Sequence, residues 1–206
     1  MTADSYPTPE EITRHEYDEP SGGQSAWVGD ARPETGYAVV DADPAWPEMY
    51  ARLAARIEGA LGDRVLAIEH VGSTAVPRLP AKPVIDIDLT VAEPADEPAW
   101  LPPLEAIGFE LRIREPWWHE HRGLRLRQPA SNLHVFGPHA PEPVRHRIFR
   151  DWLRDHPDDL ASYAEAKRRA AAEANAAGEH VMEYNARKQT VIREIYDRAF
   201  CAAGLL

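Results

Sequence analysis

Apolar residues recur at helical spacing in one early segment and throughout the last third of the chain. Between Trp46 and Leu61 they fall four positions apart, which places them on one helix face, and Gly62 follows as a stop. The later segments repeat this amphipathic spacing and end near Pro157, near Gly178 and near the C-terminus. We therefore predict one early helix and three C-terminal helices. The C-terminal helices are expected at residues 143–156, about 158–177 and about 180–200.

Strands are predicted where short apolar runs, or alternating apolar and polar residues, lie between turn residues. Residues 64–70 and 84–91 show this pattern, and a short helix is expected over 100–108. Three further strands are expected at 109–114, 123–128 and 132–136. These elements favour one α/β (α+β) domain, a mixed sheet flanked by helices with a helical C-terminal part.

The first 36 residues differ from the rest of the chain. They carry repeated Pro and Gly and many acidic residues, and their few apolar residues follow no helical or strand period. Such a segment buries too little to offset its ordering entropy, so we expect an extended or disordered lead. No catalytic role is expected for it, although Trp27 could pin part of it to the body. The folded domain is predicted over 37–206, with a sheet-containing core at 37–138 and a helical part at 139–206.

Composition excludes several classes of protein. The 206 residues include 34 acidic residues against 23 Lys and Arg, a formal net charge of −11. This balance argues against a binder of nucleic-acid backbones and against a basic membrane-surface protein. The single Cys excludes a Cys-rich zinc site, and no run approaches the ~20 apolar residues that cross a bilayer. We expect a soluble, cytoplasmic protein.

Two acidic residues interrupt the most apolar predicted strand. Side chains alternate between the faces of a strand, so Asp86 and Asp88 point the same way, about 7 Å apart. Asp is depleted in strands, and two carboxylates on one face repel each other, so a solvated strand face alone explains them poorly. Oxygen ligands of this kind suit Mg²⁺ (or Mn²⁺), which commonly takes its other ligands from water and substrate phosphates.

A possible phosphate turn lies upstream of this strand. Gly72 and Ser73 directly follow the first predicted strand, where backbone N–H groups and the Ser hydroxyl could cradle phosphate oxygens. Taken alone, a Gly-Ser pair is usually only a turn. Twelve residues separate Ser73 from Asp86, and this spacing gives the pair its weight.

Val-Gly-Ser, a spacer of twelve and Asp-Ile-Asp-Leu resemble the signature of DNA-polymerase-β-like nucleotidyltransferases. The chain resembles the GrpB (UPF0157) family more closely, over about residues 37–202. The resemblance rests on short segments that occur in the same order in both. They are Asp43 to Pro47, Glu69 to Pro77, Ala81 to Ile87, Asn132 to Phe136, Phe149 to Arg154, Tyr163 to Lys167, and Tyr184 with Lys188.

The resemblance implies that ATP or another nucleoside triphosphate binds with Mg²⁺ between the sheet and the C-terminal helices. Gly72 and Ser73 match the turn that holds the β- and γ-phosphates, and Asp86 and Asp88 match the metal-binding acids. Nucleotidyltransferases normally add a third acid from a later strand, but here the corresponding residue is His134. Either His134 serves as a metal ligand or general base, or the site binds nucleotide without two-metal chemistry.

Positive charge is scarce overall but gathers near the predicted site. Arg112 and Arg114 should share one strand face, and Arg125 and Arg127 another; some of these would instead pair with acids at the surface. The remaining candidates for contact with the nucleotide lie in the loop before the acidic strand and on the C-terminal helices. The candidate nucleotide-binding residues are Gly72, Ser73, Lys82, Arg125, Arg150, Lys167 and Lys188.

Aromatic residues accompany these cations. Tyr163 and Tyr184 precede Lys167 and Lys188 by four positions, so each ring shares a helix face with an amine and could flank a base or an acceptor. Alternatively, the Lys stems simply cover apolar surface. The adjacent pair Trp117-Trp118 could wall an acceptor pocket or pack as a lid on the core.

Two functions follow from these patterns. The first is a Mg²⁺-dependent enzyme that transfers a nucleotidyl group from a nucleoside triphosphate to a small-molecule acceptor, or adenylates and ligates that acceptor. The −11 charge favours a small acceptor over a nucleic acid. The second is a non-catalytic nucleotide-binding or interaction module, which the missing third acid favours. No nucleophile motif supports a hydrolase.

Overall fold

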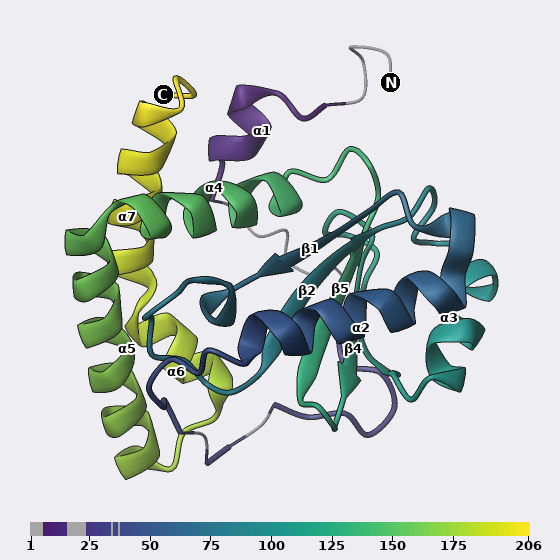
Figure 1. The fold of residues 1–206 in the computed structure, drawn as a ribbon, viewed down its shortest axis with the longest axis horizontal. Helices are drawn as coiled ribbons and strands as arrows, with labels where there is room; N and C mark the ends of the chain where they lie inside the picture. Colours follow the sequence, from purple (N-terminus) through teal and green to yellow (C-terminus); the bar gives the residue numbers. More distant parts are fainter. Residues whose placement is uncertain (1–5, 16–23, 34, 37) are drawn as a thin grey trace.

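A five-stranded mixed sheet forms the centre of the molecule (Figure 1). The structure is a computed structural model that describes residues 6–15, 24–33, 35–36 and 38–206. The strand order is β1-β2-β5-β4-β3; β2 and β5 are parallel, and the other neighbours are antiparallel. This arrangement confirms the predicted mixed sheet with flanking helices. The strands are β1 (Ala67–Val71), β2 (Ile85–Thr90), β3 (Glu110–Glu115), β4 (His121–Leu126) and β5 (Ser131–Phe136).

One face of the sheet packs against helices α2 (Trp46–Leu61) and α3 (Glu97–Ala106). The predicted stripe of α2 is confirmed, since Leu53, Ile57 and Leu61 are buried and contact the core. Alternate residues of β2 and β5 fill the facing layer, because strand side chains repeat every second position. The apolar half of β2 is therefore committed to this core, and its other half faces the opposite side.

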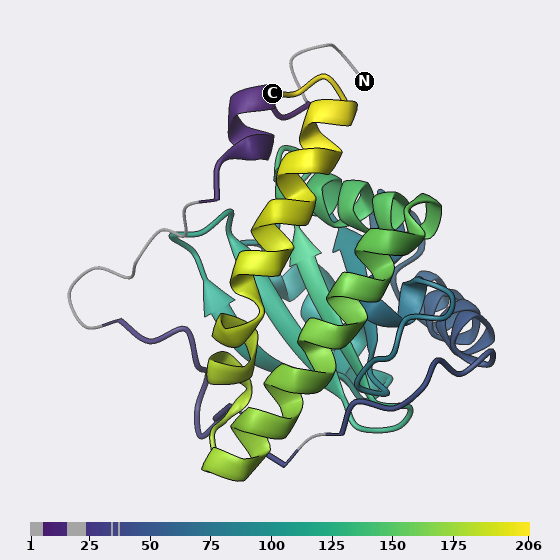
Figure 2. The same ribbon diagram turned by 90° about the vertical axis from the view of Figure 1, so that its left-hand side faces the viewer.

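The opposite face carries the C-terminal helices α4 (Glu142–Asp155), α5 (Pro157–Ala177), α6 (Val181–Arg187) and α7 (Gln189–Ala202). In Figure 2, α5 and α7 cross in front of the strands. Gly178 ends α5 in the left-handed conformation, as its position predicts. The helices pack mainly on one another and on the loop after β1. Polar space is thus left between them and the sheet.

Most predicted boundaries shift by up to three residues; the helix expected at 100–108 lies at 97–106, and the strand expected at 123–128 lies at 121–126. Two other differences have a clear backbone origin. The helix expected over 180–200 is broken at Lys188, where the backbone (φ −104°, ψ 1°) leaves the helical region and separates α6 from α7. The first strand begins at Ala67 rather than residue 64, because Gly62–Arg64 forms a 3₁₀ turn. Both differences arise from backbone choices that side-chain periodicity does not encode.

The N-terminal lead is only partly extended, and the prediction is wrong for Pro9–Thr13, which form helix α1. Thr8 and Glu11 form a capping box at its start, and Ile12 is buried against Val144 and Phe200 of α4 and α7. The capping box and the burial of Ile12 stabilise this helix, and neither could be inferred from the overall composition of the segment. Residues 1–5 and 16–23 lie outside the described part of the chain.

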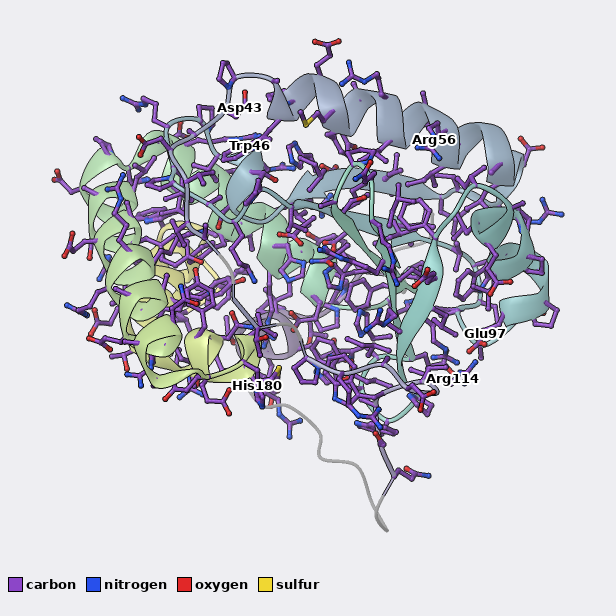
Figure 3. The ribbon with its side chains drawn as sticks, turned by 90° about the horizontal axis from the view of Figure 1, so that it is seen from below. Asp43, Trp46, Arg56, Glu97, Arg114 and His180 are labelled. Atoms are coloured by element: carbon purple, nitrogen blue, oxygen red, sulfur yellow. The ribbon has the colours of Figure 1, made fainter. Side chains whose placement is uncertain are left out.

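Ion pairs join helix α3 to strands β3 and β4 at one edge of the sheet. Glu97 of α3 accepts hydrogen bonds from Arg114 and Arg122, and Glu97 and Arg114 lie side by side in Figure 3. Arg114 is therefore engaged away from the polar face. Within the described residues, no helix combines the length and apolar character needed to cross a membrane.

Candidate functional site

The strand register gathers the predicted site residues on the face covered by the C-terminal helices. Asp86 lies opposite Asn132, and Asp88 opposite His134, in the parallel pair of β2 and β5. Directly opposed residues share a face, so all four side chains point away from α2. Arg125 joins them through its pairing with Asn132. The predicted common face of the two aspartates is present.

Asp88 is the more buried of the two acids, with 2% exposure. Its Oδ2 accepts a hydrogen bond from His146 Nδ1 at 2.8 Å, whereas its Oδ1 is buried and has no hydrogen-bond partner among the described residues. Burial alone would lower the pKa of His146, but Asp88 and then Glu142 raise it to about 9. The imidazolium of His146 therefore balances Asp88 at neutral pH. A buried carboxylate oxygen without a partner is costly and marks a place for a cationic ligand.

Asp86 lies against the turn after β1. Its Oδ1 accepts a hydrogen bond from Asn132 Nδ2 at 2.7 Å. Its Oδ2 occupies the space beside Gly72, where an added Cβ would lie 2.4 Å from that oxygen. Gly72 also has φ +67°, a conformation that other residues rarely adopt. The glycine thus lets the phosphate turn and the acidic strand approach one another.

Three lysines converge on the other side of this turn. Lys167 is buried and donates a hydrogen bond to Ser73 Oγ. Burial and then Lys188 hold the pKa of Lys167 well below its usual value, against the attraction of Asp86. Burial lowers the pKa of Lys188 to about 8. Lys82 and Lys188 lie over the ring of Tyr184, at 5.3 and 4.7 Å from its centroid.

A cavity of about 720 Å³ connects these groups. Gly72, Ser73 and Asp86 line it together with His134 and the three lysines. Asp88, on the same face of β2, is buried and is not among the residues that line the cavity. A smaller cavity of about 210 Å³ adjoins it at Gly72 and Ser73. The predicted juxtaposition of the acidic strand and the phosphate turn around one space is therefore present.

His134 ends a chain of buried hydrogen bonds. Glu115 Oε2 lies 2.6 Å from His121 Nδ1, and His121 Nε2 lies 3.0 Å from His134 Nδ1. A carboxylate only accepts, so His121 donates from Nδ1 to Glu115, and its Nε2 shares the second hydrogen bond with His134 Nδ1. Burial and then His121 lower the pKa of His134 to about 4. In the tautomer in which the neutral His134 donates from Nδ1, its Nε2 carries a lone pair.

The predicted cations take different roles. Arg125 lines the cavity and donates to Asn132 Oδ1 at 2.9 Å. Arg150 lines the smaller cavity, but its guanidinium donates to Glu69, to the carbonyl of His70 and to Asp151, so it anchors the end of β1. Arg127 is exposed near Glu110. Arg150, a predicted nucleotide ligand, is thus committed to structural pairs.

His146 carries no signal in the sequence patterns, because it lies on an ordinary amphipathic helix. Trp27 was expected at most to pin the N-terminal lead to the body; it pairs with Ile113 and also lines the cavity. Glu115 and His121 were not predicted as site residues; His121 bonds to both Glu115 and His134. Trp118 does line the cavity, as one reading of the Trp pair proposed.

The acidic pair fits a hard divalent cation only with help from a substrate. No group of three or more His, Cys, Asp or Glu side chains stands ready to hold a metal ion within the described residues. Mg²⁺, however, is commonly held by one or two carboxylates together with substrate phosphates and water. The unpartnered Asp88 Oδ1 and the Asp86 carboxylate beside Gly72 match that donor set.

The fold and site define a mixed-sheet protein with a strand-borne acid pair facing a basic cavity. A family model described as GrpB protein matches residues 37–198, so the chain belongs to the GrpB family. It is 42% identical to UPF0157 protein BH1888 of Halalkalibacterium halodurans over 85% of this chain and 89% of that protein. It is 38% identical to UPF0157 protein PA4798 of Pseudomonas aeruginosa, over 80% and 68% of the two chains.

A solved structure and a more distant relative extend this comparison. The crystal structure of conserved protein GrpB from Enterococcus faecalis superposes with a TM-score of 0.70 at 28% identity, covering 81% of this chain and 99% of that one. A protein named dephospho-CoA kinase from Mycolicibacterium paratuberculosis is 32% identical over 79% of this chain. This chain spans only 46% of that protein.

Proposed function

We propose that this protein binds a nucleoside triphosphate with Mg²⁺ and transfers its nucleotidyl group to a small-molecule acceptor, directly or through an adenylate. The observation that carries the proposal is the meeting of Asp86, Asp88 and the Gly72–Ser73 turn beside one cavity lined with lysines. The resemblance to DNA-polymerase-β-like nucleotidyltransferases supports the same role. In a chain with a net formal charge of −11, a cavity lined by three lysines would attract an anionic ligand.

The phosphates of the triphosphate would lie at the lysine end of the cavity. Ser73 and the adjoining backbone would hold the β- and γ-phosphates, and Lys82, Lys167 and Lys188 would neutralise them. Burial lowers the pKa of both Lys167 and Lys188, so an arriving anion would restore their full charge.

The acids and His134 would serve the reacting phosphorus. Asp86 and Asp88 would hold Mg²⁺, whose positive charge would stabilise the negative charge of the leaving pyrophosphate. The acceptor hydroxyl, amine or carboxylate would bond to the α-phosphorus as the bond to pyrophosphate breaks. A proton lost by the acceptor would pass to Nε2 of His134, whose ring orientation the Glu115–His121 chain holds. His146 would keep Asp88 oriented.

The relatives named dephospho-CoA kinase do not extend that name to this chain. The match covers less than half of those proteins. It does show that a region similar to this chain occurs within proteins named for a phosphoryl-transfer reaction. We regard that association as support for nucleotide chemistry in general rather than for one acceptor.

Pyrophosphate release tests the proposal. The protein is incubated with Mg²⁺, each of ATP, GTP, CTP and UTP, and pools of small hydroxyl, amine and carboxylate compounds. We expect acceptor-dependent pyrophosphate release with at least one nucleotide, falling at least 100-fold in Asp86→Asn, which preserves the shape that Asn132 contacts. Asp63→Asn, an exposed carboxylate outside the cavity, is the matched control. Equal rates in Asp86→Asn and the wild type would remove the acid pair from the mechanism.

A second function, nucleotide binding without turnover, is favoured by one observation. The position of the usual third acid is His134, and the protonated His146 already balances the charge of Asp88. This alternative predicts that triphosphates raise the melting temperature through Lys167 and Lys188 while no acceptor produces pyrophosphate. Any acceptor-dependent release that requires Asp86 excludes it.

A further inference from the structure

The cavity extends well beyond the acid pair, to the far edge of the sheet. Its lining includes Arg112 and Ile113 of β3 as well as Asp86 of β2. Three strand spacings separate β3 from β2 in the sheet order, which is about 14 Å. A triphosphate centred on Ser73 and the lysines leaves this far end unfilled, so it requires its own explanation.

A β-bulge directs an arginine into the far end. The register between β3 and β4 shifts between Leu111 and Ile113, and Arg112 is the extra residue. Bulges re-aim side chains in this way. Arg112 Nε is buried and has no hydrogen-bond partner among the described residues, although Nη1 lies 3.9 Å from Glu110. An unpaired buried guanidinium N–H is costly unless an acceptor reaches it.

The N-terminal lead builds the outer wall of this end. Ala26 and Val28 pair with β3: Arg114 N donates to Ala26 O at 2.8 Å, and Val28 N donates to Arg112 O at 3.0 Å. The pairing places Trp27 opposite Ile113, and Trp27 and Arg32 both line the cavity. The family match begins at residue 37, so this wall lies outside it.

Both ends of the cavity are lined by cations, lysines at one end and arginines at the other. Arg32, Arg112 and Arg125 line it in addition to the three lysines, whereas Asp86 is its one Asp or Glu, so the described lining carries 6 − 1 = +5. The lysine end suffices for a triphosphate. A nucleobase is uncharged, so it would supply no anionic acceptor for the buried Nε of Arg112. Trp27, Trp118 and Phe136 add flat apolar surface beside them.

We propose that the β3 end of the cavity is the acceptor subsite, and that it takes a small molecule with an anionic group on a planar, apolar body. Arg112 and Arg125 would hold the anionic group, since a guanidinium fork matches carboxylate and phosphate oxygens. Trp27 would cover the planar body. That the bound molecule is an acceptor rests on the proposed function, but the binding of such an anion can be tested separately.

Calorimetric titration with matched probes tests the subsite. The probes are 2-naphthoate, 2-naphthyl phosphate and the neutral 2-naphthylmethanol, each measured with and without a saturating, non-hydrolysable ATP analogue and Mg²⁺. We expect at least one anionic probe to bind saturably and at least tenfold more tightly than the neutral one. Comparing the two anions shows whether a carboxylate or a phosphate is preferred.

Variants from two different elements locate the binding. Arg112→Gln and Trp27→Ala should each weaken the anionic probe at least tenfold and change the affinity for the ATP analogue less than twofold. Arg127→Gln, an exposed arginine of the same hairpin, should match the wild type. The proposal is overturned if no anionic probe binds, if both variants bind it normally, or if Arg112→Gln weakens the analogue equally, because the far end would then hold the nucleoside.

The two proposals can fail independently. Anionic probe binding that depends on Arg112, in a protein that releases no pyrophosphate, would end the proposed function and leave the subsite intact. Asp86-dependent pyrophosphate release from a protein whose Arg112→Gln variant binds every probe normally would leave the function intact and remove the subsite.

Discussion

Gly72 determines how closely the phosphate turn approaches the acid pair. Replacing it with Ala would put a methyl group 2.4 Å from Asp86 Oδ2 and would strain a backbone with φ +67°. We expect Gly72→Ala to lose about 1–3 kcal/mol of unfolding free energy and at least tenfold in nucleotide affinity. Urea unfolding and calorimetric titration measure the two effects.

Gly59→Ala is the matched control. Gly59 is an exposed residue in the last turn of α2, and an added Cβ would meet nothing within 4 Å. Ala is favoured over Gly in a helix interior by about 0.5–1 kcal/mol, so this variant should be slightly more stable than the wild type. If both variants behaved alike, the contact between Gly72 and Asp86 would have no special role.

His70, at the end of β1 before the Gly72–Ser73 turn, should make the stability of the fold sensitive to acid. It stacks on Tyr50, its Nε2 lies 3.0 Å from Thr74 Oγ1, and burial lowers its pKa to about 4. An unfolded His titrates near 6.5, so between these values the unfolded chain binds more protons and stability falls as the pH falls. From pH 7 to pH 5 this one group should remove about 2 kcal/mol of unfolding free energy.

Unfolding of the wild type and His70→Gln at both pH values checks this expectation. Gln retains a donor for Thr74 but does not titrate, so the difference between pH 7 and pH 5 should be about 2 kcal/mol smaller in the variant. His134, whose pKa is also lowered to about 4, keeps its contribution in both proteins. An identical pH dependence of the two proteins would show that His70 is not buried in neutral form.

At the scale of elements, the break between α6 and α7 places a titratable cation in the cavity. Lys188 sits at the break, and burial lowers its pKa to about 8. A lysine is charged below its pKa, so the contribution of Lys188 to nucleotide affinity should be steady up to about pH 8 and then weaken, by at most tenfold per pH unit, as its charge is lost. Calorimetric titration of an ATP analogue from pH 6.5 to 9.5 measures this profile.

Two substitutions separate the charge of Lys188 from its shape. Lys188→Arg keeps a charge throughout this range, so the bend near pH 8 should disappear. Lys188→Gln should bind weakly at every pH and also show no bend. If the bend persisted in Lys188→Gln, another group would be responsible for it, and Lys188 would not contact the phosphates.

At the scale of the whole molecule, the parts that were predictable follow short-range periodicity. The shared face of Asp86 and Asp88 is a consequence of the two-residue repeat of a strand, and the α2 stripe follows the helical repeat. The docking of Trp27 on the body was predicted, but its place in the cavity and that of His146 were not, because α4 and the lead approach the site only through tertiary packing. Arg112 and Arg114 were expected on one face, but the bulge at Arg112 separates them.

The ends of the chain are held together by α1, which packs on α4 and α7. Ile12 is 1% exposed against Val144 and Phe200, and its carbonyl accepts a hydrogen bond from Arg145 Nε at 2.6 Å. Removing most of its side chain leaves a cavity at this junction, so Ile12→Ala should cost about 2–4 kcal/mol of unfolding free energy. For a chain of this size, that loss corresponds to a fall in melting temperature of roughly 4–16 °C.

Leu66→Ala is the control for this junction, because Leu66 is 55% exposed and should change stability by less than about 0.5 kcal/mol. Thermal unfolding of both variants measures the difference. Arg145 is adjacent in sequence to His146, which bonds to Asp88, so loosening α1 should also weaken nucleotide binding in Ile12→Ala. A variant that melts with the wild type would show that α1 is detached in solution, and the N-terminal helix would then stabilise neither the fold nor the site.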